Sequence, residues 1–286
     1  MDSNINKSDV SSWHLIFSLL LAFVFLFLRF VLNRFVFRRL AIWVLSFKSI
    51  SLKYDESSQA KIEKCMESMW KLTYYGTAEV CILKAINHEK WFRSTEEYFK
   101  GWPNQELTFP VKLYYMCQCG FYLYSIGALV KWETRRKDFS VMMSHHIITV
   151  ILISYSYITR FFRIGSVVLA LHDASDVFME AAKIFKYAEN ELGASVLFGF
   201  FAISWLLTRL IFFPFWVIHA SSYHLAKVLR LSEAYDMLLY YVFNTMLLTL
   251  LVFHIYWWIL ICFMIKRQLK NRGQVGEDIR SDSEDD

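Results

Sequence analysis

Seven long apolar blocks, separated by shorter charged stretches, dominate the pattern of hydrophobic and polar positions along the chain. They cover residues 13–32, 69–86, 113–130, 140–158, 164–182, 196–218 and 238–265. A helix needs about 20 mostly apolar residues to cross the hydrocarbon core of a bilayer. The pattern therefore predicts an all-α polytopic membrane protein with about seven transmembrane helices. The second block is the weakest, because it contains Lys71, Glu79 and Lys84.

Composition supports this class and excludes several others. Hydrophobic residues make up 56% of the 286 residues and charged residues 20%, against about 45–50% and about 25% in soluble domains. Such a chain excludes a soluble enzyme with a large core, a disordered chain and nucleic acid as a partner. The five cysteines lack the spacing of metal ligands and are odd in number, which argues against a disulfide framework.

The distribution of charge predicts the orientation in the membrane. Lys and Arg gather after the first block, between the third and fourth, and after the last, and such an excess marks the cytosolic side. We therefore expect a lumenal N-terminus, which carries a glycosylation sequon at Asn6, and a cytosolic, acidic C-terminus. The first block has no small-residue cleavage site, so we expect a retained signal-anchor.

The expected division of the chain follows from these features. Residues 1–68 hold the signal-anchor helix and a basic cytosolic loop, residues 69–266 the catalytic membrane domain, and residues 267–286 the acidic cytosolic tail. Pro214, inside the sixth block, is expected to kink its helix.

A histidine pair and an acidic stripe lie inside two adjacent blocks. His145 and His146 stand roughly 9 Å inside the cytosolic end of the fourth block. Asp173, Asp176 and Glu180 in the fifth block are spaced three and four residues apart, so they share one helical face at a similar depth. A carboxylate can set the tautomer of an imidazole and hold its basic nitrogen toward a substrate. This pattern favours a catalytic site.

Two other interpretations stay open. The same ionisable groups could form a buried polar lock between helices, without chemistry. A metal site is the second alternative, but the H-x-x-H-H and H-x-x-x-H patterns are absent, and the scattered His219, His224 and His254 complete a poor ligand set. We therefore expect no metal.

The stretch from Lys131 to Tyr187 closely resembles the core motif of ceramide synthases in the TLC-domain (longevity-assurance) family. The matching positions are Lys137-Asp138-Phe139, His145-His146, Thr149, Arg163 with Gly165, His172-Asp173, Asp176, Glu180 and Lys183. The stretch GWPNQELTFPVKLYYMCQCGFY and the tail EDIRSDSEDD are similar to the plant branch of that family. The resemblance covers nearly the whole chain from Trp13 onward.

The resemblance implies a six-helix TLC bundle around a buried catalytic chamber, in a multi-pass protein of the endoplasmic reticulum membrane. It also implies the N-acylation of a sphingoid base. Fatty acyl-CoA donates its acyl group to the amine of the base, which gives a ceramide or dihydroceramide and free CoA. Acyl-CoA is then a substrate, and no cofactor is needed. Membrane lipids are further partners, and a homodimer or heterodimer is left open.

The resemblance further implies roles for the intramembrane residues. His145 is expected to take the acyl group as an acyl-imidazole, with His146 as base or orienting partner and His172 assisting. Asp173 and Asp176 are expected to hold an imidazole or to bind the amine as ammonium.

A second set of charged residues is expected to bind substrate. A basic cluster at the cytosolic mouth would meet the phosphates of CoA, although positive-inside topology explains such a cluster equally well. Its members are Lys131, Arg135, Arg136 and Lys137. Glu180 is expected to orient Lys183, unless the two form only a structural pair.

The remaining expectations concern the tail, the chain length and rival functions. Ser281 and Ser283 precede acids and suit an acidophilic kinase. In the family, the loop between the last two spans, here residues 219–237, influences acyl-chain length, and the resemblance to plant members favours a C16 donor. The rivals are a non-catalytic TLC-fold lipid sensor, chaperone or carrier, a zinc-dependent ceramide hydrolase and a seven-span receptor.

Overall fold

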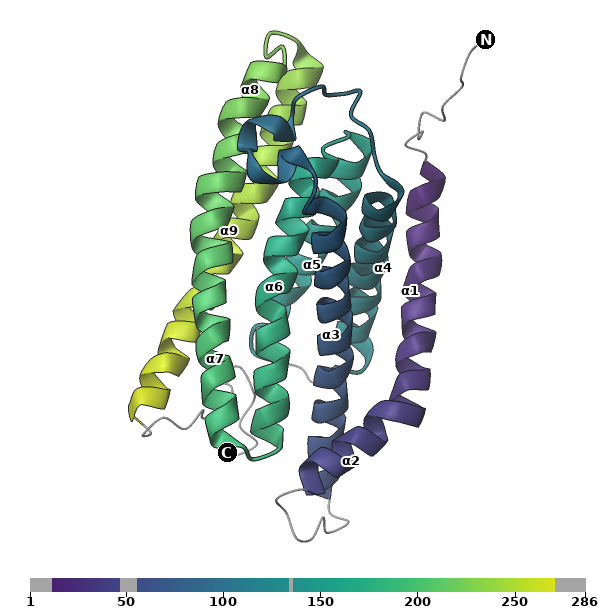
Figure 1. The fold of residues 1–286 in the computed structure, drawn as a ribbon, viewed down its shortest axis with the longest axis vertical. Coiled ribbons are helices and arrows are strands. Elements are labelled where there is room, and N and C mark those ends of the chain that lie inside the picture. Colours follow the sequence, from purple (N-terminus) through teal and green to yellow (C-terminus); the bar gives the residue numbers. More distant parts are fainter. Residues whose placement is uncertain (1–11, 47–55, 134–135, 271–286) are drawn as a thin grey trace.

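A computed structural model describes residues 12–46, 56–133 and 136–270, in which seven long helical passes form a bundle (Figure 1). The passes are α1 (Ser12–Leu32) continued by η1 (Asn33–Phe37) and α2 (Arg38–Ser46); α3 (Glu56–Ile86); α4 (Phe109–Lys131); α5 (Phe139–Ile158); α6 (Phe162–Tyr187); α7 (Glu191–Trp205) continued by η4 (Leu206–Ile218), η5 (Ala220–His224) and α8 (Leu225–Val228); and α9 (Ala234–Lys270). The short helices η2 (Lys90–Arg93) and η3 (Thr95–Tyr98) lie between α3 and α4. The prediction of an all-α bundle with about seven helices is confirmed.

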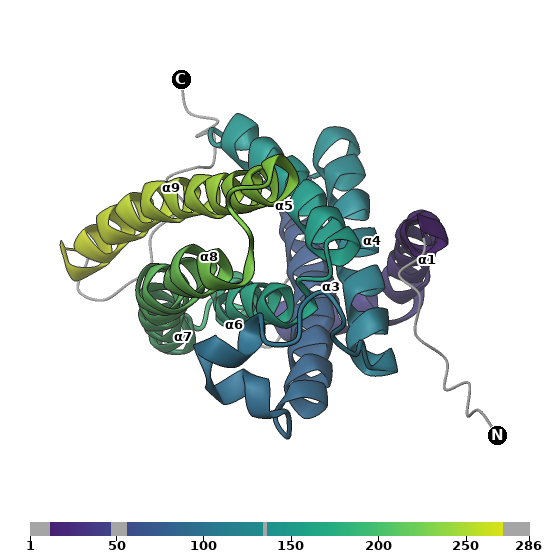
Figure 2. The ribbon, with the colours of Figure 1, turned by 90° about the horizontal axis from the view of Figure 1, so that it is seen from above.

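Successive passes run in opposite directions, so the bundle has two distinct ends. We call the end that holds α2 the α2 end, and the opposite end, with η2, η3 and α8, the loop end (Figure 1). Helix α6 lies at the centre, packed against α3 and α7, whereas α1 lies at the edge beside α4 (Figure 2). Residues near the middle of α6 are therefore enclosed by other helices.

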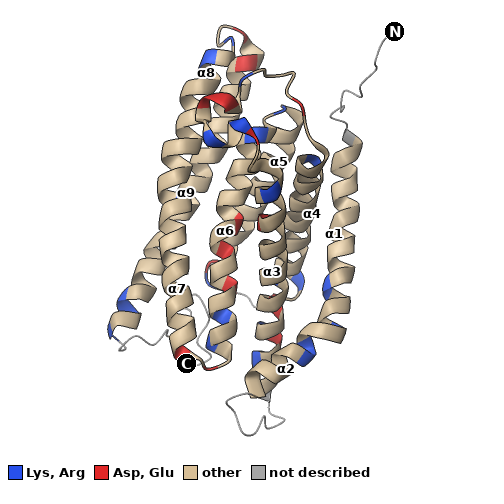
Figure 3. Cartoon of the chain, viewed as in Figure 1, with Lys and Arg blue, Asp and Glu red and all other residues tan. Residues whose placement is uncertain are grey.

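The passes differ in hydrophobicity. Four described segments are long and apolar enough to cross a membrane: Trp13–Ser46, Phe139–Ile158, Glu191–Val228 and Ala234–Lys270. Helix α6 instead carries acidic side chains in the middle of the bundle (Figure 3). Such a helix can cross a bilayer when its neighbours shield its polar side chains. The chain is a multi-pass membrane protein.

Large apolar side chains cover the outer surface of the bundle. Phe23 on α1, Phe215 on η4 and Val252 on α9 are 69%, 72% and 63% exposed. In water this amount of exposed apolar surface would be unfavourable, whereas lipid chains solvate it well. The exposed faces therefore fit a bilayer as solvent.

Two stretches predicted as loops are largely helical. The basic stretch after the first span continues as α2 to Ser46, where Ala41 and Leu45 pack against Ile62 and Cys65 of α3. In residues 219–237 the helix of α7 continues to Val228, and α9 begins at Ala234. In both stretches an apolar face is buried against a neighbouring helix. This burial stabilises helical structure, although the charged residues of these stretches predicted loops.

Gly120 of α4 determines how closely α1 approaches. A Cβ atom at this position would stand 2.8 Å from Leu21 Cβ and 2.8 Å from the carbonyl oxygen of Ser18. Gly127, on the same helix, has nothing within 4 Å. We expect Gly120→Ala to push α1 away from α4 and to lower the free energy of unfolding by about 1–3 kcal/mol.

The matched variant Gly127→Ala should leave stability unchanged or raise it, because alanine favours a helix over glycine. The midpoint of thermal unfolding in detergent, followed by fluorescence-detected size-exclusion chromatography, separates the two variants. Equal midpoints would contradict the close packing of α1 on α4.

Candidate active site

The predicted histidine pair lies on α5, in the half of the bundle nearer the α2 end. His145 is 5% exposed, and its ring packs edge-on against Trp257 of α9, with ring centroids 5.2 Å apart. Trp257 in turn donates its Nε1–H to Asp138 Oδ2 at 3.0 Å. The ring of His146 lies 5.5 Å from that of Tyr122 on α4. The two adjacent imidazoles therefore face different helices.

A second pair of imidazoles forms between α6 and α9. His172 Nε2 and His254 Nε2 lie 2.8 Å apart, and His172 Nδ1 lies 2.6 Å from the carbonyl oxygen of Val168. Because a carbonyl oxygen can only accept, Nδ1 of neutral His172 carries the proton and its Nε2 is an acceptor. His254 must then donate from Nε2, so its Nδ1 is a lone pair, buried and without a hydrogen-bond partner.

The four rings form one group, which we call the four-histidine cluster (His145, His146, His172 and His254). The ring centroid of His145 is 5.7 Å from that of His146, 6.3 Å from that of His172 and 6.4 Å from that of His254. The Nδ1 atoms of His145 and His146 are buried without a hydrogen-bond partner. A neutral imidazole nitrogen with a free lone pair can accept a proton or attack a carbonyl carbon. The cluster therefore offers both a base and a nucleophile.

The acidic stripe of α6 is divided between two neighbouring helices. Asp173 is fully buried, and its Oδ2 accepts hydrogen bonds from Gln118 and, at 3.3 Å, from the hydroxyl of Tyr114, both on α4. Asp176 pairs instead with Arg209 of η4, at 3.0 Å. The expectation that a carboxylate holds an imidazole does not match these contacts, because neither carboxylate hydrogen-bonds to a histidine within the described ranges. A second imidazole and a backbone carbonyl fix the tautomers instead.

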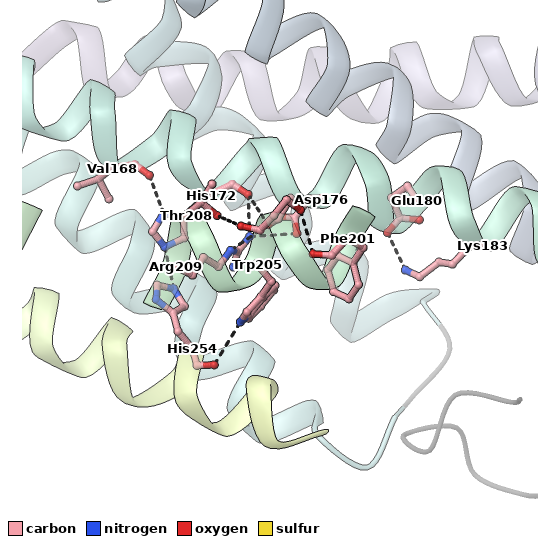
Figure 4. Close-up of polar contacts among 12 residues, drawn as sticks. Val168, His172, Asp176, Glu180, Lys183, Phe201, Trp205, Thr208, Arg209 and His254 are labelled. Atoms are coloured by element: carbon pink, nitrogen blue, oxygen red, sulfur yellow. Dashed lines mark hydrogen bonds and ion pairs between the residues drawn. The ribbon is translucent and has the colours of Figure 1, made fainter. Parts of the chain in front are cut away.

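Arg209 links the four-histidine cluster to the acidic stripe (Figure 4). It is 3% exposed, and it donates to the carbonyl oxygen of His172 at 2.7 Å and to Ser175 Oγ at 3.1 Å. Its guanidinium carbon lies 4.1 Å from the ring centroid of Trp205, whose indole N–H donates to the carbonyl oxygen of His254. A buried charge with this many partners is fully compensated. Arg209 therefore holds η4, α6 and α9 in one arrangement.

The segment that carries Arg209 has an unusual helical geometry. Residues Leu206–Ile218 form a π-helix, and the helix continues through Pro214 to Ile218. Wider π turns often occur at functional sites, and they accommodate a residue that lacks a backbone N–H. This stretch of η4 faces the middle of α6, where the cluster lies.

Paired charges lie between the cluster and the α2 end. Glu180 is 1% exposed, and its carboxylate lies 2.7 Å from the ammonium of Lys183. Lys71 of α3 lies 2.7 Å from Glu67 and 3.1 Å from Glu133. These pairs compensate charges that would otherwise be costly at this depth.

The predicted basic cluster lies at the α2 end as well. Lys131 ends α4 and Lys137 precedes α5, both exposed, and Arg136 is partly exposed. Four predicted sites lie outside the residues that the structure describes: Arg135, Ser281, Ser283 and Asn6.

A narrow cavity of about 20 Å³ begins beside the four-histidine cluster and extends toward the loop end. Its walls are mostly apolar, and they consist of Tyr122, Thr149, Leu152, Ile153, Ser156, Gly165, Val168, Leu169, His172, Phe243, Leu247 and Leu250. Thr149 lies one turn from His145 and donates its hydroxyl to the carbonyl oxygen of His145 at 2.8 Å. A cavity with polar groups at one end and apolar walls suits a ligand with a reactive head and an alkyl chain.

Among the described side chains, no group of three or more His, Cys, Asp and Glu residues is arranged to hold a metal ion. Comparison with known sequences identifies the family of this chain. The profile described as "TLC domain" matches residues 64–263. The chain belongs to the TLC-domain family. The prediction from the stretch between Lys131 and Tyr187 is confirmed.

Several relatives of this TLC-domain protein carry the name ceramide synthase. Ceramide synthase LOH2 of Arabidopsis thaliana is 63% identical over 281 residues, which cover 98% of this chain and 95% of the relative. ASC1-like protein 3 of Oryza sativa subsp. japonica is 63% identical over 90% of this chain and 91% of the relative. Ceramide synthase 4 of Mus musculus is 37% identical over 81% of this chain and 56% of the relative. The similarity is highest to plant proteins in this group, as the motif predicted.

Two residues beside the site of this TLC-domain protein were not predicted from the sequence. Arg209 was not singled out, and His254 was grouped with scattered histidines. Both carry an ionisable side chain inside an apolar block, and such residues mark function by default. A search for ionisable residues in the sixth and seventh blocks, like the one in the fifth, would have identified Arg209 and His254.

Proposed function

We propose that this TLC-domain enzyme is a ceramide synthase, a sphingoid base N-acyltransferase that makes ceramide or dihydroceramide from fatty acyl-CoA. One observation carries the proposal: two adjacent histidines with partner-free Nδ1 atoms lie about one helical turn before Thr149, which lines a mostly apolar cavity. The names of the plant relatives support the same activity. A lipid carrier needs the cavity but not the paired imidazoles.

In the first step the acyl group moves from CoA to the enzyme. A lone pair of neutral His145 attacks the thioester carbonyl, so that a C–N bond forms, the C–S bond breaks and CoA leaves as the thiolate. The acyl-imidazolium then loses its N–H proton through His146, and the thiolate takes up that proton. Tyr122 lines the cavity beside His146, where its hydroxyl can donate to the carbonyl oxygen as negative charge develops.

In the second step the sphingoid base takes the acyl group. Its neutral amine attacks the acyl carbon, the amide C–N bond forms and the bond to His145 breaks. The surplus proton of the amine passes to the released imidazole, which restores the neutral enzyme. Before this step Asp173 supports binding of the amine as ammonium, because its Oδ1 is buried and has no hydrogen-bond partner. The ammonium then gives one proton to this carboxylate and becomes the neutral nucleophile, and the carboxyl group releases that proton to solvent after turnover.

The length of the cavity favours a long-chain donor over a very-long-chain one. Ser156 is the last residue of α5 in its wall, and it lies about 16 Å beyond His145 at 1.5 Å per residue. An extended alkyl chain advances about 1.3 Å per carbon, given C–C bonds of about 1.5 Å. A chain that starts at His145 reaches the end of the wall after about 13 carbons at these spacings, which favours a donor near C16 over donors of C22 to C26.

We place the α2 end in the cytosol and the loop end in the lumen of the endoplasmic reticulum. Basic residues at the α2 end support this orientation by the positive-inside rule. Lys131, Arg136 and Lys137 would then meet the phosphates of CoA, while the acyl chain points toward the lumenal side. The orientation brings the thioester to the cluster from the cytosolic face.

The proposal is tested in microsomes that express the chain and receive sphinganine and palmitoyl-CoA. We expect dihydroceramide to form and its rate to be unchanged by EDTA, because imidazole nitrogens perform the transfer. Microsomes without the chain are the control. A rate that falls with EDTA and returns with zinc would support the hydrolase running in reverse. No ceramide with donors from C16 to C26 would overturn the proposal in favour of a lipid sensor or carrier.

A further inference from the structure

The wall of the cavity ends at the same level along the bundle axis on three helices. Its wall runs from Thr149 to Ser156 on α5, from His172 back to Gly165 on α6, and from Leu250 back to Phe243 on α9. Each of these stretches contains eight residues, and their seven steps of 1.5 Å correspond to about 10 Å along a helix. The agreement between three helices defines a flat end to the cavity, with Ser156, Gly165 and Phe243 around it.

Tyr115 of α4 closes this end from one side. It is fully buried, and its hydroxyl lies 3.4 Å from Ser156 Oγ and donates to the carbonyl oxygen of Phe162 at 3.2 Å. A Cβ atom built on Gly165 would stand 1.8 Å from the Tyr115 hydroxyl. The tyrosine hydroxyl therefore occupies the space that the absence of a side chain at Gly165 leaves between α4 and α6.

Phe243 and Phe161 close the end from the other side. Their ring centroids lie 5.0 Å apart, and both residues are 1% exposed. Phe161 also packs edge-on against Phe99, with centroids 5.5 Å apart. We call Tyr115, Phe161 and Phe243 the aromatic plug.

The aromatic plug rests on a fixed layer at the loop end. Trp102 Nε1 donates to the carbonyl oxygen of Thr159 at 2.8 Å, and Arg163 donates to the carbonyl oxygen of Glu97 at 2.7 Å. These bonds tie the turn between α5 and α6 to the segment between α3 and α4. Because packed interiors do not absorb extra volume without strain, a ligand cannot lengthen the cavity by moving the plug.

We propose that the aromatic plug sets the maximum length of the acyl chain, with Phe243 as the residue that the chain end meets. The inference rests on the proposed ceramide synthase function. A chain that starts at His145 and follows this wall meets the plug after about 13 carbons, so a C16 donor is near the limit. Each further methylene must either displace a packed ring or leave the thioester short of His145, so longer donors react more slowly.

The experiment compares two variants of α9 whose residues line opposite ends of the cavity. Phe243→Ala removes a ring of the plug, and Leu250→Ala removes a similarly buried side chain beside the four-histidine cluster. Microsomes receive sphinganine with equimolar palmitoyl-CoA and C24 acyl-CoA, and the ratio of C24 to C16 product is measured by mass spectrometry. The ratio is independent of expression level, so partial loss of folded protein does not affect it.

We expect Phe243→Ala to raise the C24 to C16 ratio by about tenfold or more, the scale of discrimination that a few methylenes produce in an apolar pocket. Leu250→Ala should leave the ratio near the wild-type value. Phe243→Leu, which keeps an apolar side chain, serves where the alanine variant has no activity, and it should raise the ratio with donors of C18 and C20.

Two results would overturn the inference while leaving the proposed function intact. One is an active Phe243 variant whose product ratio equals that of the wild type, and the other is an equal rise in the ratio for Leu250→Ala. Wild-type microsomes that form no ceramide from any donor would instead refute the proposed function itself.

Discussion

Replacing His145 with alanine is expected to lower ceramide formation by at least about 10³-fold, because loss of a nucleophile removes the covalent route. The expectation depends on the position of His145, at the centre of the four-histidine cluster and one turn from the cavity wall. His219→Ala is the matched control, since His219 is exposed near the loop end. Rates are compared in microsomes at equal amounts of folded protein.

A direct measurement of the acyl-enzyme separates the roles of the two adjacent histidines. Purified protein is incubated with an alkyne-labelled acyl-CoA, without sphingoid base, and peptide mass spectrometry locates the acyl group. We expect the label on His145 in the wild type, no label in His145→Ala, and a labelled but slowly discharging enzyme in His146→Ala. A label on His146 that persists in His145→Ala would reverse the assignment.

Replacing Arg209 with methionine is expected to lower the free energy of unfolding by about 3–5 kcal/mol, because it leaves the Asp176 carboxylate buried without its partner. The guanidinium also fixes the carbonyl of His172 and packs on Trp205. Ceramide formation should therefore fall in the fraction of protein that still folds. Thermal unfolding in detergent and the specific activity of the monodisperse peak measure the two effects separately.

The double variant Arg209→Met/Asp176→Asn tests the cause of this loss. It removes both charges, so it should recover part of the unfolding free energy, because no unpaired ion remains. Arg209→Lys keeps the charge but loses the planar fork, and we expect an intermediate loss. If Arg209→Met were as stable as the wild type, Arg209 would not hold the helices around the cluster.

The sequence was sufficient for the architecture and for three of the four histidines of the cluster. Seven apolar blocks of membrane-spanning length predict seven passes, because only helices satisfy the backbone inside a bilayer. His145, His146 and His172 were identified because ionisable residues in apolar blocks are costly. The structure brings these three together as the pattern predicted.

The remaining part of the site depends on pairings that no local pattern encodes. The spacing places Asp173 and Asp176 on one face of α6. Asp173 nevertheless hydrogen-bonds to α4, whereas Asp176 pairs with Arg209 of η4, because α6 has several neighbouring helices. His254 lies 82 residues from its partner His172 along the chain. Such partners follow from which helices become neighbours, and that depends on packing of the whole bundle.

The apolar wall of the cavity has a consequence for the choice of acceptor. An acyl-imidazole hydrolyses readily wherever water can reach it, so an enzyme of this kind must exclude the solvent that would compete with its amine. The side chains along the cavity wall are aliphatic or aromatic, apart from Thr149, Ser156 and the polar rings of His172 and Tyr122. The hydroxyls of Thr149 and Ser156 donate to carbonyl oxygens of α5. Water finds few partners there, whereas an amine with a long alkyl tail is drawn in by the same surface. For the proposed acyl-histidine route, the apolar wall therefore favours transfer to a lipid amine over hydrolysis, without any contact to the nucleophile.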